Sequence, residues 1–95
     1  MGKYTLVASY KGGAYISQYC TVNPFAAERV WANNLSAGFF SREELLEIQK
    51  QVYRNYCSGE GLPVPAAKPI SSVWQNHYDI FGQDLRLDII QTALW

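Results

Sequence analysis

The side chains best suited to chemistry lie near the C-terminal end of the sequence, around its single histidine. His77 is followed by Asp79, and Arg86 and Asp88 come after a Gly82-Gln83 pair. Glycine at the first central position of a two-residue loop favours a type II′ hairpin turn, which would pair His77 with Asp88 and Asp79 with Arg86. A carboxylate beside an imidazole is the core of many general-base sites, because it fixes the ring tautomer and stabilises the imidazolium.

The same four side chains also have a plainer interpretation. The sequence places no identifiable nucleophile beside His77, and opposite-charge pairs across two strands are routine stabilising units of a solvated sheet face. We therefore expect a polar binding patch or a solvated face rather than a catalytic centre. A small enzyme that uses His77 and Asp88 stays an alternative.

The two cysteines offer little further chemistry. Cys20 and Cys57 are too far apart in the sequence to form a metal-binding or redox motif. Cys57 falls near the C-terminus of a predicted helix, where the helix dipole disfavours a thiolate, and Cys20 has the inward parity of its predicted strand. We expect two buried, reduced thiols and predict no catalytic residue, no metal ligand and no cofactor.

Residues 3–22 predict a β-hairpin, because two stretches rich in Tyr, Thr, Val and Ile flank Lys11-Gly12-Gly13. A three-residue loop separates apolar from polar side chains better than a two-residue Gly12-Gly13 turn, so we prefer it. It places Tyr15 and Tyr19 on the polar, open side of the sheet, whereas the shorter turn would place them beside Leu6 and Ala8. The inward side of the preferred hairpin consists of Leu6, Ala8, Tyr10, Ala14, Ile16 and Cys20.

The tyrosines of this hairpin predict contacts with another macromolecule. Aromatic side chains on an open sheet face stack nucleic-acid bases, and tyrosine is equally a favoured residue of protein interfaces. Only Lys3 and Lys11 are basic in the hairpin, so the charge favours a protein partner. Glycines between two strands lack the strand–loop–helix setting of a phosphate-binding loop, which leaves Lys11 as a tip residue that can touch a partner. The alternating set is Tyr4, Tyr10, Tyr15 and Tyr19.

Two helices are predicted from their ends. Asn23-Pro24 is a start signal, since Asn caps a helix and Pro needs no N–H at the first helical position. Ser41 and Glu44 have the capping-box spacing, and the helix that they begin runs to about Cys57 with Gly59 as its stop. The apolar stripes are Ala27, Val30, Trp31 and Leu35 in the first helix and Leu45, Ile48, Val52 and Tyr56 in the second.

These elements predict one α+β domain over residues 1–95, in the order ββααββ. The proline-rich residues 58–69 should form an extended crossing loop. The two hairpins should join into a four-stranded antiparallel sheet with both helices packed on one face, because each helix has one apolar stripe to bury. The other face of the sheet would be open. Which strand edges join the two hairpins stays undecided.

Composition favours a protein that associates with other proteins. Only 17% of the residues are charged and the net charge is zero, against about 25% charged residues in typical domains. The sequence has no apolar run of membrane-spanning length and no secretion signal, so we expect a cytoplasmic location and no membrane partner. Self-association through Trp95, giving a homodimer, is a further alternative.

We therefore expect a small protein-binding module, of the inhibitor, antitoxin- or immunity-like, or adaptor kind, that acts through its open sheet face. A single-stranded nucleic-acid-binding module that uses the sheet tyrosines is the alternative. The residues expected to bind are Lys11, Tyr15, Tyr19, His77, Asp79, Arg86 and Asp88.

Overall fold

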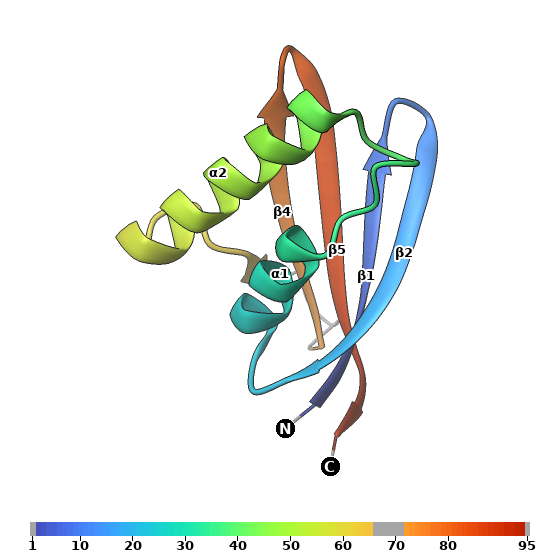
Figure 1. Cartoon of the computed structure of the whole chain (residues 1–95). Helices are drawn as coiled ribbons and strands as arrows, with labels where there is room; N and C mark the ends of the chain where they lie inside the picture. Colours follow the sequence, from blue (N-terminus) through green and yellow to red (C-terminus); the bar gives the residue numbers. More distant parts are fainter. Residues whose placement is uncertain (1, 66–71, 95) are drawn as a thin grey trace.

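Two long hairpins make up most of the sheet in the computed structural model, which describes residues 2–65 and 72–94. β1 (Gly2–Tyr10) pairs with β2 (Gly13–Thr21), and β4 (Val73–Ile80) pairs with β5 (Gln83–Leu94). β1 also pairs with β5 in an antiparallel register, so the first and last strands lie in the middle of the sheet (Figure 1). The hairpins thus join through β1 and β5, the choice that the sequence left open.

The sheet has a fifth strand that the sequence analysis did not predict. β3 (Val64–Pro65) lies inside the segment predicted as an extended loop and pairs with Gln75 and Trp74 of β4. The strand order is β2-β1-β5-β4-β3. The prediction of a four-stranded sheet is therefore wrong, because β3 adds a fifth, short strand at one edge. An extended, proline-containing segment already has strand-like backbone angles, so β3 forms where the segment meets the edge of β4.

Both hairpins turn through two residues in the left-handed region. Lys11 and Gly12 have φ values of 50° and 78°, and Phe81 and Gly82 have φ values of 52° and 85°. Positive φ at both central positions is the type I′ turn, whose twist matches that of the flanking strands. The loops are therefore Lys11-Gly12 and Phe81-Gly82, neither of which was the predicted loop.

In the first hairpin this turn reverses the predicted faces of β2. Tyr10 pairs with Gly13 and Ala8 with Tyr15, a register one residue away from the predicted one. Because side chains alternate along a strand, a slip of one residue moves each of them to the other face. Tyr15 and Tyr19 therefore lie on the helix-covered face, as the rejected shorter turn would have placed them. Ala14, Ile16 and Cys20, predicted to face inward, are exposed.

In the second hairpin the turn shifts the register by two residues, which keeps the faces and changes the partners. Tyr78 remains on the inner face, now opposite Leu85. His77 lies opposite Arg86 and not Asp88, and Asp79 lies opposite Asp84 and not Arg86. The predicted cross-strand pairs of this hairpin are therefore wrong, although their side chains share one face.

The predicted starts of both helices and the predicted end of the second are confirmed. The first helix ends at Asn33, so Leu35 of its predicted apolar stripe lies beyond it. α1 (Pro24–Asn33) begins after Asn23, whose side chain accepts a hydrogen bond from the backbone N–H of Ala26 at 2.7 Å. α2 (Arg42–Ser58) begins with the complete Ser41–Glu44 capping box and ends at Gly59 in the left-handed region. Tyr56, predicted to be buried, is 41% exposed.

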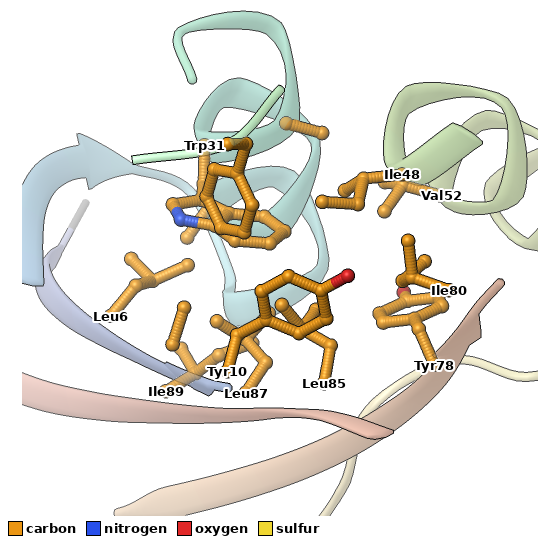
Figure 2. Packing of buried hydrophobic residues seen from close by; sticks show 14 of the residues in the cluster. Leu6, Tyr10, Trp31, Ile48, Val52, Tyr78, Ile80, Leu85, Leu87 and Ile89 are labelled. Carbon is orange, nitrogen blue, oxygen red and sulfur yellow. The ribbon is translucent and has the colours of Figure 1, made fainter. Parts of the chain in front are cut away.

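Both helices pack on the same face of the sheet, as predicted (Figure 1). Trp31 of α1 and Ile48 and Val52 of α2 lie over strand residues such as Leu85 and Leu87 (Figure 2). Each fully buried aliphatic side chain of this kind contributes about 1.5–3 kcal/mol. In the part of the chain that the structure describes, no helix has the length and apolarity needed to cross a bilayer. Trp95 lies outside the described residues.

Candidate interaction surface

The face of the sheet opposite the helices carries a continuous row of apolar side chains. Ile16 of β2 lies beside Val7 of β1, and Ile90 of β5 lies beside Val73 of β4. Val7 and Ile90 are diagonal neighbours, because Ile90 is the register partner of Thr5. Ile16 is 64% exposed and the other three are partly exposed. We refer to Val7, Ile16, Val73 and Ile90 as the apolar diagonal.

A group of charged side chains lies beside the apolar diagonal, at the end of the sheet where both hairpins turn. His77 Nδ1 lies 3.5 Å from Asp84 Oδ1, and Arg86 Nε lies 3.3 Å from Asp88 Oδ1. Three carboxylates face one guanidinium and one imidazole here, so negative charge is in excess. We refer to His77, Asp79, Asp84, Arg86 and Asp88 as the acidic corner.

The acidic corner contains four of the predicted binding residues but not the predicted general-base pair. The carboxylate nearest His77 belongs to Asp84, which the sequence analysis did not single out. Asp88 is held instead by Arg86 and by the Gln75 amide, whose Nε2 donates to Asp88 Oδ1 at 3.0 Å. His77 and Asp88 do not pair because the register of this hairpin differs by two residues from the predicted one.

A shallow hollow of about 480 Å³ lies between the two hairpin tips. Its walls combine the glycine backbone of the first turn with charged side chains of both hairpins. The lining residues are Ser9, Tyr10, Lys11, Gly12, Gly13, Ala14, Asp84 and Arg86.

Lys11, expected to reach out to a partner, is held by the second helix. Its Nζ lies 2.9 Å from Glu44 Oε2, and the Tyr10 hydroxyl donates to the same oxygen at 2.5 Å. The hydrogen bonds from Tyr10, from the Ser41 backbone and from Lys11 lower the pKa of Glu44 from 4.5 to about 2. In turn, burial and the neighbouring carboxylate raise the pKa of Tyr10 to about 12. The ion pair between Lys11 and Glu44 therefore connects the hairpin tip to the start of α2.

Tyr15 and Tyr19, the other two predicted binding residues, lie on the covered face and pack against the core. The Tyr15 ring is 5.5 Å from that of Phe39 and 6.0 Å from that of Phe40. Neither tyrosine contributes to the surface formed by the apolar diagonal and the acidic corner. Cys20 and Cys57 are free thiols, but both are exposed and not buried as predicted.

The sequence analysis did not predict a buried polar cluster between the helices and the sheet, formed by Glu28, Asn76 and Tyr78. Glu28 of α1 is only 2% exposed, and it accepts a hydrogen bond from Asn76 Nδ2 at 3.1 Å. The loss of solvation raises the pKa of Glu28 from 4.5 to about 7, against the opposing hydrogen bonds from Asn76 and Tyr78. The sequence held a signal for it, because Glu28 precedes Trp31 by three residues and Ala32 by four, on the stripe that faces the sheet.

Asn76 also ties this cluster to the segment that follows α2. Its Nδ2 lies 2.8 Å from the Gly61 carbonyl oxygen, which also accepts from Asn55 Nδ2 at 3.2 Å. Gly61 has a φ of +72°, and a Cβ there would lie 2.7 Å from the Asn55 side chain. The cluster therefore joins α1, α2 and β4 to one glycine carbonyl.

Within the described ranges, no three His, Cys, Asp or Glu side chains are grouped as metal ligands would be. The chain matches no known protein family, and neither the curated proteins nor the solved structures gave a match.

Proposed function

We propose that this chain is a small protein-binding module, acting as an inhibitor or adaptor, whose outer sheet face binds a partner protein. The observation that carries the proposal is the apolar diagonal, which crosses four strands on a face that no helix of the described residues covers. An exposed row of apolar side chains with a polar border is typical of a protein interface. Its aliphatic residues lie on a paired sheet and therefore lose little freedom on binding.

The acidic corner defines the chemistry of the partner. A partner that places an apolar ridge on the diagonal and lysine or arginine side chains beside it would match both parts of the surface. Such charge complementarity contributes mainly to the association rate and to the choice of partner. Binding should therefore slow as the salt concentration rises, since exposed charges are screened over about 8–10 Å at 0.1–0.15 M salt.

The proposed location is the cytoplasm. Cys20 and Cys57 are both exposed and unpaired, and exposed free thiols are more compatible with a reducing compartment than with an oxidising one.

Two other functions have less geometric support. A base-stacking surface needs exposed aromatic side chains, whereas Tyr15 and Tyr19 pack under the helices. The predicted general-base pair of His77 and Asp88 is not formed, because Asp88 is held by Gln75 and Arg86. His77 lies beside Asp84 instead, and both of these side chains are largely exposed to solvent. We therefore propose neither nucleic-acid binding nor catalysis.

The experiment is affinity capture from a native lysate, with bound protein and nucleic acid quantified before and after nuclease treatment. The bait is compared with Val7→Lys and Ile90→Lys, which place a positive charge on the apolar diagonal. The matched control is Leu46→Lys, because Leu46 is 55% exposed on α2. We expect a nuclease-resistant partner that both diagonal variants lose and the control retains.

A partner that binds all variants equally, or none in any arm, overturns the proposal. Recovery of nucleic acid, with the bound proteins lost after nuclease treatment, would also overturn it, in favour of the nucleic-acid alternative. Circular dichroism of each variant confirms that the substitutions leave the fold intact.

A further inference from the structure

β2 is an edge strand without the usual protection of an edge. Among the described residues no strand pairs with its outer side, and no backbone hydrogen bond from a turn or loop reaches it. Its nine residues include no proline and no charged side chain. Natural proteins normally protect such an edge with lysine, proline, a bulge or a covering segment. The opposite edge has this protection, because β3 and Pro65 cover part of β4.

The hairpin turn determines which backbone groups of β2 are free. The residues that flank a type I′ turn form a hydrogen-bonded pair, here Tyr10 and Gly13. Hydrogen-bonded and non-hydrogen-bonded pairs alternate in an antiparallel ladder, so Tyr15 and Ser17 also direct their backbone groups toward β1. The groups that point outward are those of Ala14, Ile16, Gln18 and Cys20.

We propose that a second copy of this chain pairs antiparallel with the free edge of β2, about a two-fold axis at Ser17. The sequence of β2 is nearly symmetric about that residue, with tyrosine two positions away on each side and a small residue three positions away, Ala14 or Cys20. A two-fold axis places each residue opposite its mirror position in the second copy, so this sequence would pair tyrosine with tyrosine and one small residue with another. The register pairs position 16 with position 18 of the second copy, and both belong to the outward-pointing set.

The inner face of the pair would be aromatic. Tyr15 would lie opposite Tyr19 of the second copy in a non-hydrogen-bonded pair, where cross-strand side chains are closest. Tyr15 already contacts Phe39 and Phe40, so the aromatic cluster would continue across the axis. Ser17 Oγ is buried without a hydrogen-bond partner in the described part of the chain. Rotation of its side chain would bring it toward the Ser17 hydroxyl of the second copy.

The outer face would also become continuous. Ile16 lies one position from the axis, so the two Ile16 side chains would be diagonal neighbours and the two apolar diagonals would join. This inference rests on the edge of β2 and is independent of the proposed function. The two proposals can therefore fail separately. A chain that dimerises but binds no other protein would contradict only the proposed function, and a monomeric chain that binds another protein would contradict only the dimer.

The test uses charge at the paired positions. Ile16→Lys with Gln18→Lys places lysines opposite lysines, whereas Ile16→Lys with Gln18→Glu places lysine opposite glutamate. Light scattering and sedimentation over a wide protein concentration range should show a dimer for the natural chain. We expect the dimer dissociation constant to rise at least about tenfold in the double-lysine variant. It should return toward the natural value in the lysine–glutamate variant.

A second measurement checks the register in the same full-length chain. With Cys20→Ser and Cys57→Ser as background, Ser17→Cys should form a disulfide between copies under mild oxidation. The two Cα atoms of a non-hydrogen-bonded pair are about 4.5 Å apart, which is within the Cα–Cα range of a disulfide. Gln18→Cys should not, since it lies opposite position 16. The proposal is overturned if the natural chain stays monomeric, or if the two charge variants have equal dimer dissociation constants. It is also overturned if a disulfide between copies forms in the Gln18→Cys variant and not in the Ser17→Cys variant.

Discussion

Phe81 is a bulky residue in a backbone conformation that favours glycine or asparagine. It is the first central residue of the β4–β5 turn, has a φ of 52° and is 66% exposed. The left-handed region costs a residue with a Cβ roughly 1–2 kcal/mol, and the exposed ring recovers little of this by burial. The turn is therefore maintained by the two strands that it joins.

Phe81→Asn should raise the free energy of unfolding by about 1 kcal/mol, because asparagine tolerates the left-handed region and is preferred at this position of a type I′ turn. Urea denaturation measures the change. Phe81→Ala is the control, since alanine also removes the exposed ring but keeps the unfavourable conformation. Equal stability of the two variants would show that the exposed ring, and not the backbone angle, determines the effect.

Glu28 makes the stability depend on pH through its buried carboxyl group. Its pKa is about 7 in the folded chain, above the ordinary value of 4.5. Between these values the folded chain holds a proton that the unfolded chain has released, so the folded state binds more protons. Its contribution to stability is therefore complete below about pH 4.5 and is lost as the pH rises toward 7.

Glu28→Gln should remove this loss, since an amide does not ionise. The stability of the variant relative to the natural chain should increase between pH 4.5 and pH 7 and stay constant above that range. Urea midpoints at several pH values provide the measurement. A difference that is independent of pH would mean that folding leaves the pKa of Glu28 at its ordinary value.

At the scale of elements, the capping box of α2 also anchors the first hairpin. Ser41 Oγ accepts from the Glu44 backbone N–H at 3.2 Å, and the Glu44 side chain accepts from the Ser41 N–H at 2.8 Å. The second oxygen of the same carboxylate binds Tyr10 and Lys11. The start of the helix and the hairpin tip are therefore positioned by one side chain.

Ser41→Ala should lower the free energy of unfolding by about 1 kcal/mol, the usual cost of removing a helix cap. Ser58→Ala, at the other end of α2, is the control and should cost much less. Urea denaturation monitored by circular dichroism compares the two. Equal losses would show that the cap does not stabilise the start of the helix.

The helices were predictable from sequence because their end signals are local. Asn23-Pro24, Ser41 with Glu44, and Gly59 each satisfy backbone groups within a few residues, so their patterns predict the observed ends. The faces of the first hairpin depended instead on a turn in which lysine adopts a positive φ, which lysine rarely does. Tyrosine added to the error, since its ring packs in a core while its hydroxyl reaches polar groups.

The candidate surface could be predicted only in part, for the same reason. His77, Asp79, Arg86 and Asp88 were correctly placed on one face because a two-residue register shift preserves side-chain alternation. Ile16 was missed because the one-residue shift of β2 moves each of its side chains to the other face. Asp84 was missed because its contact with His77 exists only in the observed register.

At the scale of the whole molecule, the ends of the described chain are adjacent. Gly2 is the register partner of Leu94, and both lie at the end of the sheet away from the hairpin tips (Figure 1). Neighbouring strands are about 5 Å apart, so a short flexible linker can join the termini.

A circular permutant that joins the termini and opens the chain between Ala37 and Gly38 should fold. Both residues are exposed and lie outside the helices and strands, and new ends are tolerated best at such sites. Circular dichroism and urea denaturation should show the natural helix content and one cooperative transition. Loss of cooperativity would show that the connection between α1 and α2 is needed to position the helices.

The central place of β1 has a consequence for the time course of synthesis. β1 is made first, but its partner β5 is made last, and translation adds only about 5–20 residues per second. For several seconds the β1–β2 hairpin therefore exists without β5, and the strand edge of β1 that will later be the centre of the sheet is unpaired. An unpaired strand edge on a growing chain is a target for aggregation and for chaperones. We therefore expect this protein to need protection during translation more than a fold whose neighbouring strands are made in succession.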